Sequence, residues 1–305
     1  AHYGRPPLSL GMEFDVLPVK EYFRYRELFP KTRFVDVSPL IKKVRSRKSP
    51  WEIAQMAQAA AVSAEVYATI PSLLRPGITE IELAGLLEAE AMKRGHEGLL
   101  RMRSLNHEAY SWHILSGASG GVISYIDAPM GGQGLSPAFP VGASRKPIQT
   151  GEPILVDFGV VINGYQVDQT RMYCIGKMPE HFRRAYEACV EIERAILAAA
   201  KPGVPCDHLF ELSVKMAADL GFGEAYLGPQ GHKVRFVGHG IGLEINELPF
   251  LAKGHSYPLE DGMTFAVEPK MVFPGEGAVG IEDTVVVQRD GCRRLTTMPD
   301  EIIEV

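Results

Sequence analysis

Five polar residues interrupt apolar stretches of the chain, and their types suggest a metal site. Each stands where a buried strand is expected: Asp157, Asp168, His239, Glu268 and Glu282. A buried charge without a partner is costly, so these side chains need hydrogen bonds, counter-charges or a bound ion. Four carboxylates brought together would also repel one another. Two divalent ions about 3.5–4 Å apart would neutralise them and could activate water.

The donor types narrow the choice of ion. A donor set of several oxygens and one nitrogen favours Mn, Co, Fe or Zn as the bound ion. It differs from a site whose ligands are all sulfur. The four cysteines are far apart and form no CxxC pair, which argues against a zinc ribbon or a disulfide scaffold. Such cysteine usage is typical of a reducing cytoplasm, where we expect the protein to act.

The elements that must position these residues follow an α+β order. Capping boxes predict helices from Pro50 to about residue 72 and from Thr79 to Gly95. A glycine-rich segment at about 115–150 is expected to be a functional loop, because so long a connection is unusual in a compact domain. Strands surround Asp157 and Asp168, two helices follow at about 179–220, and further strands come after them. The repeated order of two helices and then strands suggests an internal duplication.

Composition excludes several classes of protein. The chain has 305 residues, 46% hydrophobic content and a net charge of −5, which indicates a globular protein with a large core. Its basic cluster, residues 42–48, is predicted to be a solvated linker, so no nucleic-acid partner is expected. No apolar run reaches about 18 residues, so no membrane span is expected. The sequence opens on Ala1 rather than methionine, which suggests a processed or shortened chain.

Four ordered blocks resemble the signature of the pita-bread metallopeptidases, a family that includes prolidase, aminopeptidase P, methionine aminopeptidase and the non-peptidase creatinase. The blocks are "VDFGVVINGYQVDQTR", "GHGIGLE", "VEP" and "GIEDTVVV". The resemblance implies an α+β pita-bread domain with a pseudo-twofold duplication over residues 48–305. Residues 1–47 resemble the end of the N-terminal domain of the prolidase and aminopeptidase P branch, together with a linker.

The resemblance also implies roles for the five residues. Asp157 would chelate one ion, Asp168 and Glu282 would bridge two ions, and His239 and Glu268 would hold the second. A bridging hydroxide would attack the scissile carbonyl, and Glu268 would pass a proton to the leaving amine.

Three neighbours of these residues are expected to support the site. Thr170 would orient a ligand, and Gly240 and Gly242 would let the backbone approach closely.

Four positions depart from the peptidase pattern. Asn246, Arg235 and Val141 stand where peptidase members usually carry histidines, and Gly280 stands where an arginine is common. The histidines position substrate and stabilise the tetrahedral intermediate, and Asn246 keeps an N–H donor that can partly replace one of them.

An imidazole could still come from elsewhere in the chain. His113, His232 and His255 are the candidates, although each is first interpreted as an ordinary surface or loop histidine.

The predicted function is a metal-dependent exopeptidase of the Xaa-Pro dipeptidase type, acting on short proline-containing peptides as a homodimer. The complete set of metal-ligand candidates favours a metal enzyme, whereas the changed outer positions favour a changed substrate. Two alternatives therefore remain: hydrolysis of a non-peptide C–N bond, as in creatinase-like relatives, and a non-catalytic binding role.

Overall fold

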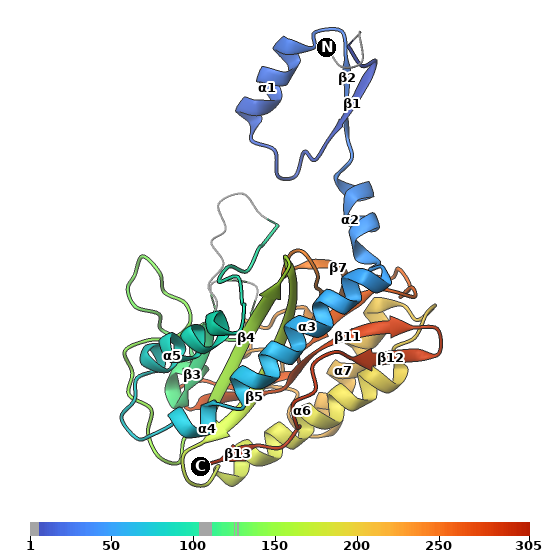
Figure 1. Cartoon of the computed structure of the whole chain (residues 1–305). Coiled ribbons are helices and arrows are strands. Elements are labelled where there is room, and N and C mark those ends of the chain that lie inside the picture. Colours follow the sequence, from blue (N-terminus) through green and yellow to red (C-terminus); the bar gives the residue numbers. More distant parts are fainter. Residues whose placement is uncertain (1–5, 104–111, 125, 127) are drawn as a thin grey trace.

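The computed structural model describes residues 6–103, 112–124, 126 and 128–305, and its elements form a small module and a larger body (Figure 1). The module contains two parallel strands joined by a helix and followed by a second helix: β1 (Ser9–Met12), α1 (Val19–Leu28), β2 (Arg33–Asp36) and α2 (Ser38–Ser46). Sequence patterns in residues 1 to about 47 indicate only short strands and loops, and that prediction is wrong because two helices are present. No side-chain hydrogen bond caps the N-terminus of α1, so its sequence lacks the capping box that predicts the later helices.

The chain passes from the module to the body through α2. This helix contains much of the basic cluster that was predicted to be a linker, and it has a proline in its first turn. Arg47 is extended, and the backbone N–H of Lys48 donates to the Gly262 carbonyl in the body at 2.8 Å. We propose that the boundary between the two parts lies between residues 47 and 48.

Capping boxes start the first helices of the body as the sequence predicts. Ser49 caps α3 (Pro50–Tyr67) with Glu52, and Thr79 caps α5 (Glu80–Lys93) with Glu82. The helix predicted to reach residue 72 ends at Tyr67, and a short helix α4 (Ile70–Leu73) follows. Pro71 explains the break, because it has no N–H to donate to the carbonyl of Tyr67.

A nine-stranded sheet forms the centre of the body. Its strands, in spatial order, are β3 (Trp112–Ser116), β4 (Ile154–Ile162), β5 (Tyr165–Cys174), β11 (Glu282–Gln288), β8 (Thr264–Val267), β6 (Phe236–Gly240) and β7 (Glu247–Ala252), with β12 (Gly291–Arg294) beside β11 and β13 (Ile303–Glu304) beside β5. A separate antiparallel hairpin consists of β9 (Lys270–Phe273) and β10 (Gly277–Gly280). Between β3 and β4 the chain forms a short 3₁₀ helix η1 (Gly117–Gly121) and then long loops, as the glycine-rich segment indicates.

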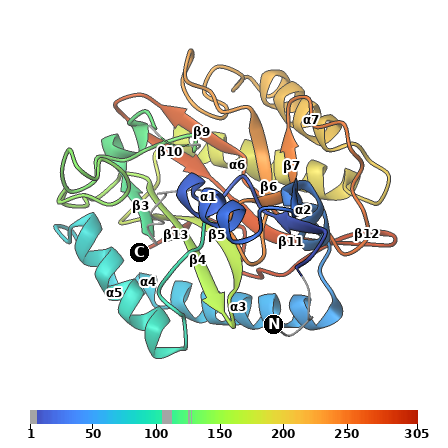
Figure 2. The ribbon, with the colours of Figure 1, turned by 90° about the horizontal axis from the view of Figure 1, so that it is seen from above.

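Helices pack on the sheet as two pairs, each with its own apolar core. One core joins α3 and α5 to β4 and β5. The other joins α6 (Glu180–Ala199) and α7 (Cys206–Asp219) to β6, β8 and the hairpin. Figure 2 shows the two pairs on opposite sides of the strands, which agrees with the expected duplication. Among the described helices, none has both the length and the apolar character needed to cross a bilayer.

Candidate metal centre

The β4–β5 hairpin and β11 carry three of the candidate carboxylates. Asn163 and Gly164 have positive φ angles and make the tight turn that sets the hairpin register. In that register Thr170 of β5 lies opposite Asp157 of β4 on one side and opposite Glu282 of β11 on the other. Paired residues of neighbouring strands share a face of the sheet. The Thr170 hydroxyl donates to Glu282 Oε2 at 2.8 Å, as expected for a residue that orients a ligand.

The strands β6 and β8 bring the remaining two residues to the same place. His239 pairs with Ala266 of β8, and Glu268 follows directly after that strand. His239 Nε2 lies 3.5 Å from Glu268 Oε1 and 3.8 Å from Glu282 Oε1. A Cβ at position 240 would overlap the backbone of Leu248, so Gly240 is needed for this close approach of strands.

The five predicted residues therefore meet, and they line one cavity of about 120 Å³ that we call the inner cavity. Within this group, one ligand atom each from Asp168, His239 and Glu282 lie within 4.8 Å of one another. That spacing suits a single cation with mixed oxygen and nitrogen ligands. Their roles as metal ligands stay a prediction.

Lys270 also lines the inner cavity, although it was not among the residues predicted from the sequence. Its ammonium donates to Asp157 Oδ2 at 2.8 Å, to Glu268 Oε2 at 2.8 Å and to Glu282 Oε2 at 3.0 Å. One signal could have pointed to it: Lys270 comes two residues after Glu268, and alternate residues of an extended segment point to the same side.

Burial and mutual repulsion set the pKa values in the inner cavity. Burial raises the pKa of Asp168, and the charge of Asp157 raises it further. Burial also raises the pKa of Glu282, with a further contribution from Asp168. For Asp157 burial acts in the same direction, but the ammonium of Lys270, together with His113 and a hydrogen bond from Thr170, outweighs it and lowers the pKa. The ammonium of Lys270 therefore does not compensate for burial and repulsion at Asp168 and Glu282.

Asn246 lies on a loop that a buried carboxylate fixes. Glu247 accepts hydrogen bonds from Lys48 Nζ at 2.8 Å and from Arg45 Nη2 at 2.5 Å. It also accepts hydrogen bonds from the backbone N–H groups of Leu243 and Glu244, both at 3.1 Å. The basic cluster is thus not a solvated linker, because two of its members anchor the loop that carries Asn246.

A second cavity of about 940 Å³, the outer cavity, lies next to the inner one. The two share Met102, His239 and Asn246 among their lining residues. Arg235 lines the outer cavity, whereas Val141 and Gly280 are not among the residues that line either cavity.

The three alternative histidines have different positions. His113 was expected to be a surface or loop residue, which is wrong, because it is buried on β3 opposite Asp157 and lines the inner cavity. Its Nε2 lies 3.2 Å from the Gly131 carbonyl oxygen, and burial lowers its pKa, which favours a neutral ring. His255 lines the outer cavity, whereas His232 is exposed.

Comparison with known proteins assigns the family. Residues 54–289 match the model of metallopeptidase family M24, and residues 2–47 match the creatinase/prolidase N-terminal domain. The chain belongs to metallopeptidase family M24. It is accordingly a hydrolase of the metallopeptidase class, as the sequence predicted, and a divalent metal is the cofactor that the family implies.

Relatives and solved structures support the same family. The chain is 29% identical to an Xaa-Pro dipeptidase of Lactobacillus helveticus, in an alignment that covers 94% of this chain and 70% of that protein. Two solved structures each align with 97% of this chain and 74% of their own length. They are an X-Pro aminopeptidase from Thermotoga maritima (28% identity, TM-score 0.83) and an Xaa-Pro dipeptidase from Bacillus anthracis (30% identity, TM-score 0.82). The predicted pita-bread fold is confirmed by these M24 structures.

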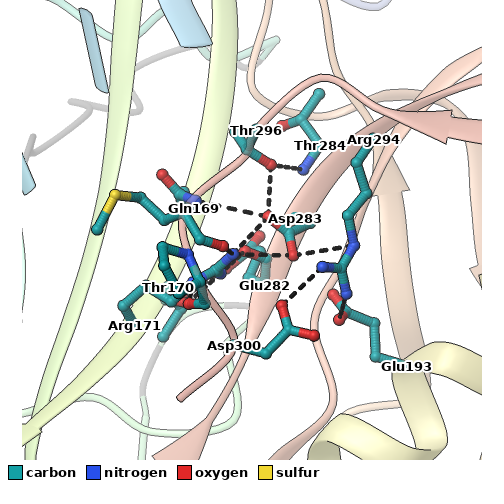
Figure 3. A network of polar contacts seen from close by, with 12 residues as sticks. Gln169, Thr170, Arg171, Glu193, Glu282, Asp283, Thr284, Arg294, Thr296 and Asp300 are labelled. Atoms are coloured by element: carbon teal, nitrogen blue, oxygen red, sulfur yellow. Dashed lines mark hydrogen bonds and ion pairs between the residues drawn. The ribbon is translucent and has the colours of Figure 1, made fainter. Parts of the chain in front are cut away.

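A buried ion network supports the M24 site from the other face of its strands (Figure 3). Arg171 follows Thr170 on β5, is fully buried, and donates to both carboxylate oxygens of Asp283 at 2.9 and 3.1 Å. Its Nη1 also donates to the backbone carbonyls of Thr170 and Glu282, both at 2.9 Å. Arg294 connects Asp283 to further carboxylates. Arg171 and Arg294 thus supply positive charge to the cluster of Glu193, Asp283 and Asp300, and we assign this cluster a structural role.

Proposed function

We propose that this chain hydrolyses short proline-containing peptides as an exopeptidase of the Xaa-Pro dipeptidase type. The observation that carries the proposal is the convergence of Asp157, Asp168, His239, Glu268 and Glu282 in the inner cavity of an M24 chain. Relatives named Xaa-Pro dipeptidase that align along nearly the whole chain support the choice of substrate.

The charges of the two cavities support a substrate with a free amino group at one end and a free carboxylate at the other. The inner cavity is acidic and suits an amino group, whereas the outer cavity has three exposed cations at its wall: Lys233, Arg235 and Lys253. A carboxylate bound by these cations would place the preceding peptide bond towards the shared residues His239 and Asn246. A dipeptide meets both requirements, because its amino and carboxylate groups flank a single peptide bond.

The residues of the chain have defined tasks in this reaction. A bound divalent ion would act as a Lewis acid that polarises the scissile carbonyl. Lys270 donates to Glu268 Oε2, so the other oxygen, Oε1, which lies 3.5 Å from His239 Nε2, would take a proton from the attacking water and return it to the leaving amine. The Asn246 amide would donate a hydrogen bond to the oxygen on which negative charge develops.

A second candidate is hydrolysis of a non-peptide C–N bond in an anionic substrate. Two observations favour it: Asn246 and Arg235 stand where peptidase members usually carry histidines, and the outer cavity is rich in cations. This substrate would use the same inner cavity and would differ in what the outer cavity binds.

Variants of Asn246 separate the two candidates. Wild-type chain supplied with Mn²⁺ is expected to release proline slowly from Xaa-Pro dipeptides. Asn246→His should raise kcat/KM about tenfold, equivalent to about 1.4 kcal/mol, because the imidazole is a longer donor that can carry charge. Asn246→Ala should lower the rate, because it removes the donor. Proline release measured by chromatography gives the rates.

The matched control is Gln230→His, which adds a histidine at an exposed position outside both cavities. It should leave the rate unchanged. If neither Asn246 variant changes proline release while a non-peptide C–N substrate is hydrolysed, the second candidate replaces the first.

The proposal also covers which divalent ion the chain binds and in which compartment it acts. The oxygen-rich donor set supports Mn, Co, Zn or Fe as the divalent ion. All four cysteines are free, and three of them are buried, which supports a reducing cytoplasm as the place of action.

A homodimer is proposed from the exposed apolar side chains of the N-terminal module. Helix α1 buries no residue, while Val19, Phe23 and Leu28 are 68%, 55% and 62% exposed. A second copy covering α1 would remove this surface from water. Light scattering should give twice the 33.5 kDa of one chain, and Phe23→Glu should halve that mass. A wild-type mass of one chain, or no change relative to the control Val214→Glu on α7, would contradict the proposal.

A further inference from the structure

The ammonium of Lys270 occupies a position that suits a cation. An ammonium has three N–H donors, and here each one has a carboxylate acceptor, from Asp157, Glu268 and Glu282. The lysine side chain is 2% exposed. Its hydrogen-bonding capacity is therefore used entirely within the inner cavity, by three of the five predicted metal ligands.

Two metal ions do not fit beside this ammonium. An ion shared by Asp157 Oδ2 and Glu282 Oε2 would need to stand about 2.0–2.2 Å from each oxygen. The Lys270 nitrogen already lies 2.8 and 3.0 Å from the same two atoms. The ion and the ammonium would have to fill the same space, so the expected pair of ions disagrees with the residues present.

The backbone of the β9–β10 hairpin is adapted to Lys270. Gly280 of β10 lies directly opposite Lys270 of β9. A Cβ at position 280 would overlap Lys270 Cγ, so any side chain there would block the path of the lysine stem. Gly280 departs from the peptidase pattern, and its missing side chain therefore leaves the space that the stem of Lys270 needs to reach the cavity.

One further cation position remains in the cavity. Asp168, His239 and Glu282 can direct ligand atoms to a common point, as their mutual spacing within 4.8 Å shows. Glu282 Oε1 is buried and has no hydrogen-bond partner among the described residues. A buried acceptor without a partner is costly, and a cation at this point would satisfy it. When all four carboxylates of the cavity are ionised, they and the ammonium carry three net negative charges, which a single divalent ion reduces to one.

We propose that the Lys270 ammonium replaces one of the two metal ions, and that the chain binds a single divalent ion between Asp168, His239 and Glu282. This inference concerns the cations and not the substrate, so it can be tested without any assay of hydrolysis. A failure to cleave proline dipeptides would leave it untouched.

The number of metal ions bound per chain tests this proposal. Wild-type chain is stripped with a chelator, titrated with Mn²⁺, freed of excess ion and analysed by elemental analysis and electron paramagnetic resonance. We expect one Mn²⁺ per chain and the signal of an isolated ion. Lys270→Ala should bind a second Mn²⁺ and give the signal of an exchange-coupled pair. The control Lys253→Ala removes an exposed lysine and should keep one ion.

A second variant protects the test against misfolding. Lys270→Met keeps most of the stem above Gly280 but has no nitrogen, so it leaves the ammonium position open, and it too should bind two ions. Two ions or none in the wild-type chain would overturn the proposal. So would a single ion in a folded Lys270→Ala or Lys270→Met chain, because Lys270 would then not be what excludes the second one.

Discussion

Replacing Asp168 with alanine is expected to remove the bound metal and most of the hydrolytic activity together. Asp168 belongs to the group of three residues with convergent ligand atoms, and its backbone is fixed by a reciprocal pair of hydrogen bonds with Thr284. The backbone should therefore keep its shape while the ligand disappears. Loss of about 4 kcal/mol of transition-state stabilisation would lower the rate about a thousandfold. Proline release and elemental analysis on the same sample measure both effects.

The control for this prediction is Asp290→Ala, which removes an exposed aspartate outside both cavities. It should keep the ion and the activity. Full occupancy by metal in the Asp168→Ala chain would show that Asp168 is not a ligand. A normal metal content combined with lost activity would instead assign Asp168 to the binding of substrate.

Arg171→Met is expected to lower the free energy of unfolding by about 3–5 kcal/mol. Breaking a buried ion pair by removing one partner leaves the other charge uncompensated, which accounts for this magnitude. Arg171 donates to Asp283 and to the backbone carbonyls of Thr170, Glu282, Met298 and Pro299, so its loss also leaves buried acceptors without donors. Urea denaturation followed by circular dichroism gives the change.

The comparison for Arg171 is Arg194→Met. Arg194 also pairs with a carboxylate, that of Asp300, but its side chain is 66% exposed. Exposed pairs contribute about 0–1 kcal/mol, so this variant should unfold close to wild type. Equal effects of the two substitutions would mean that the buried network contributes no more than a surface contact.

Much of the fold was predictable because local signals agreed with it. Ser49 with Glu52 and Thr79 with Glu82 each form the expected capping box, and runs of β-branched residues mark the central strands β4 and β11. The convergence of Asp157, Asp168 and Glu282 was predictable for a related reason. A carboxylate in a buried strand needs hydrogen bonds, a counter-charge or a bound ion. Several such carboxylates in one chain therefore suggest a single site that they share.

Other features depend on contacts that sequence patterns do not contain. Lys270 resembles an ordinary strand residue until the β9–β10 hairpin places it opposite Gly280. His113 depends on the pairing of β3 with β4, which brings it opposite Asp157. Helix α1 was missed because no side chain caps its N-terminus, whereas capping boxes mark α3 and α5.

The overlap at position 280 also makes residues 270 and 280 an interdependent pair. With this backbone, a side chain at position 280 would keep the lysine from reaching the carboxylates and would leave a long charged chain among buried neighbours. A lysine at position 270 therefore requires a glycine at position 280, whereas the glycine sets no such requirement on residue 270.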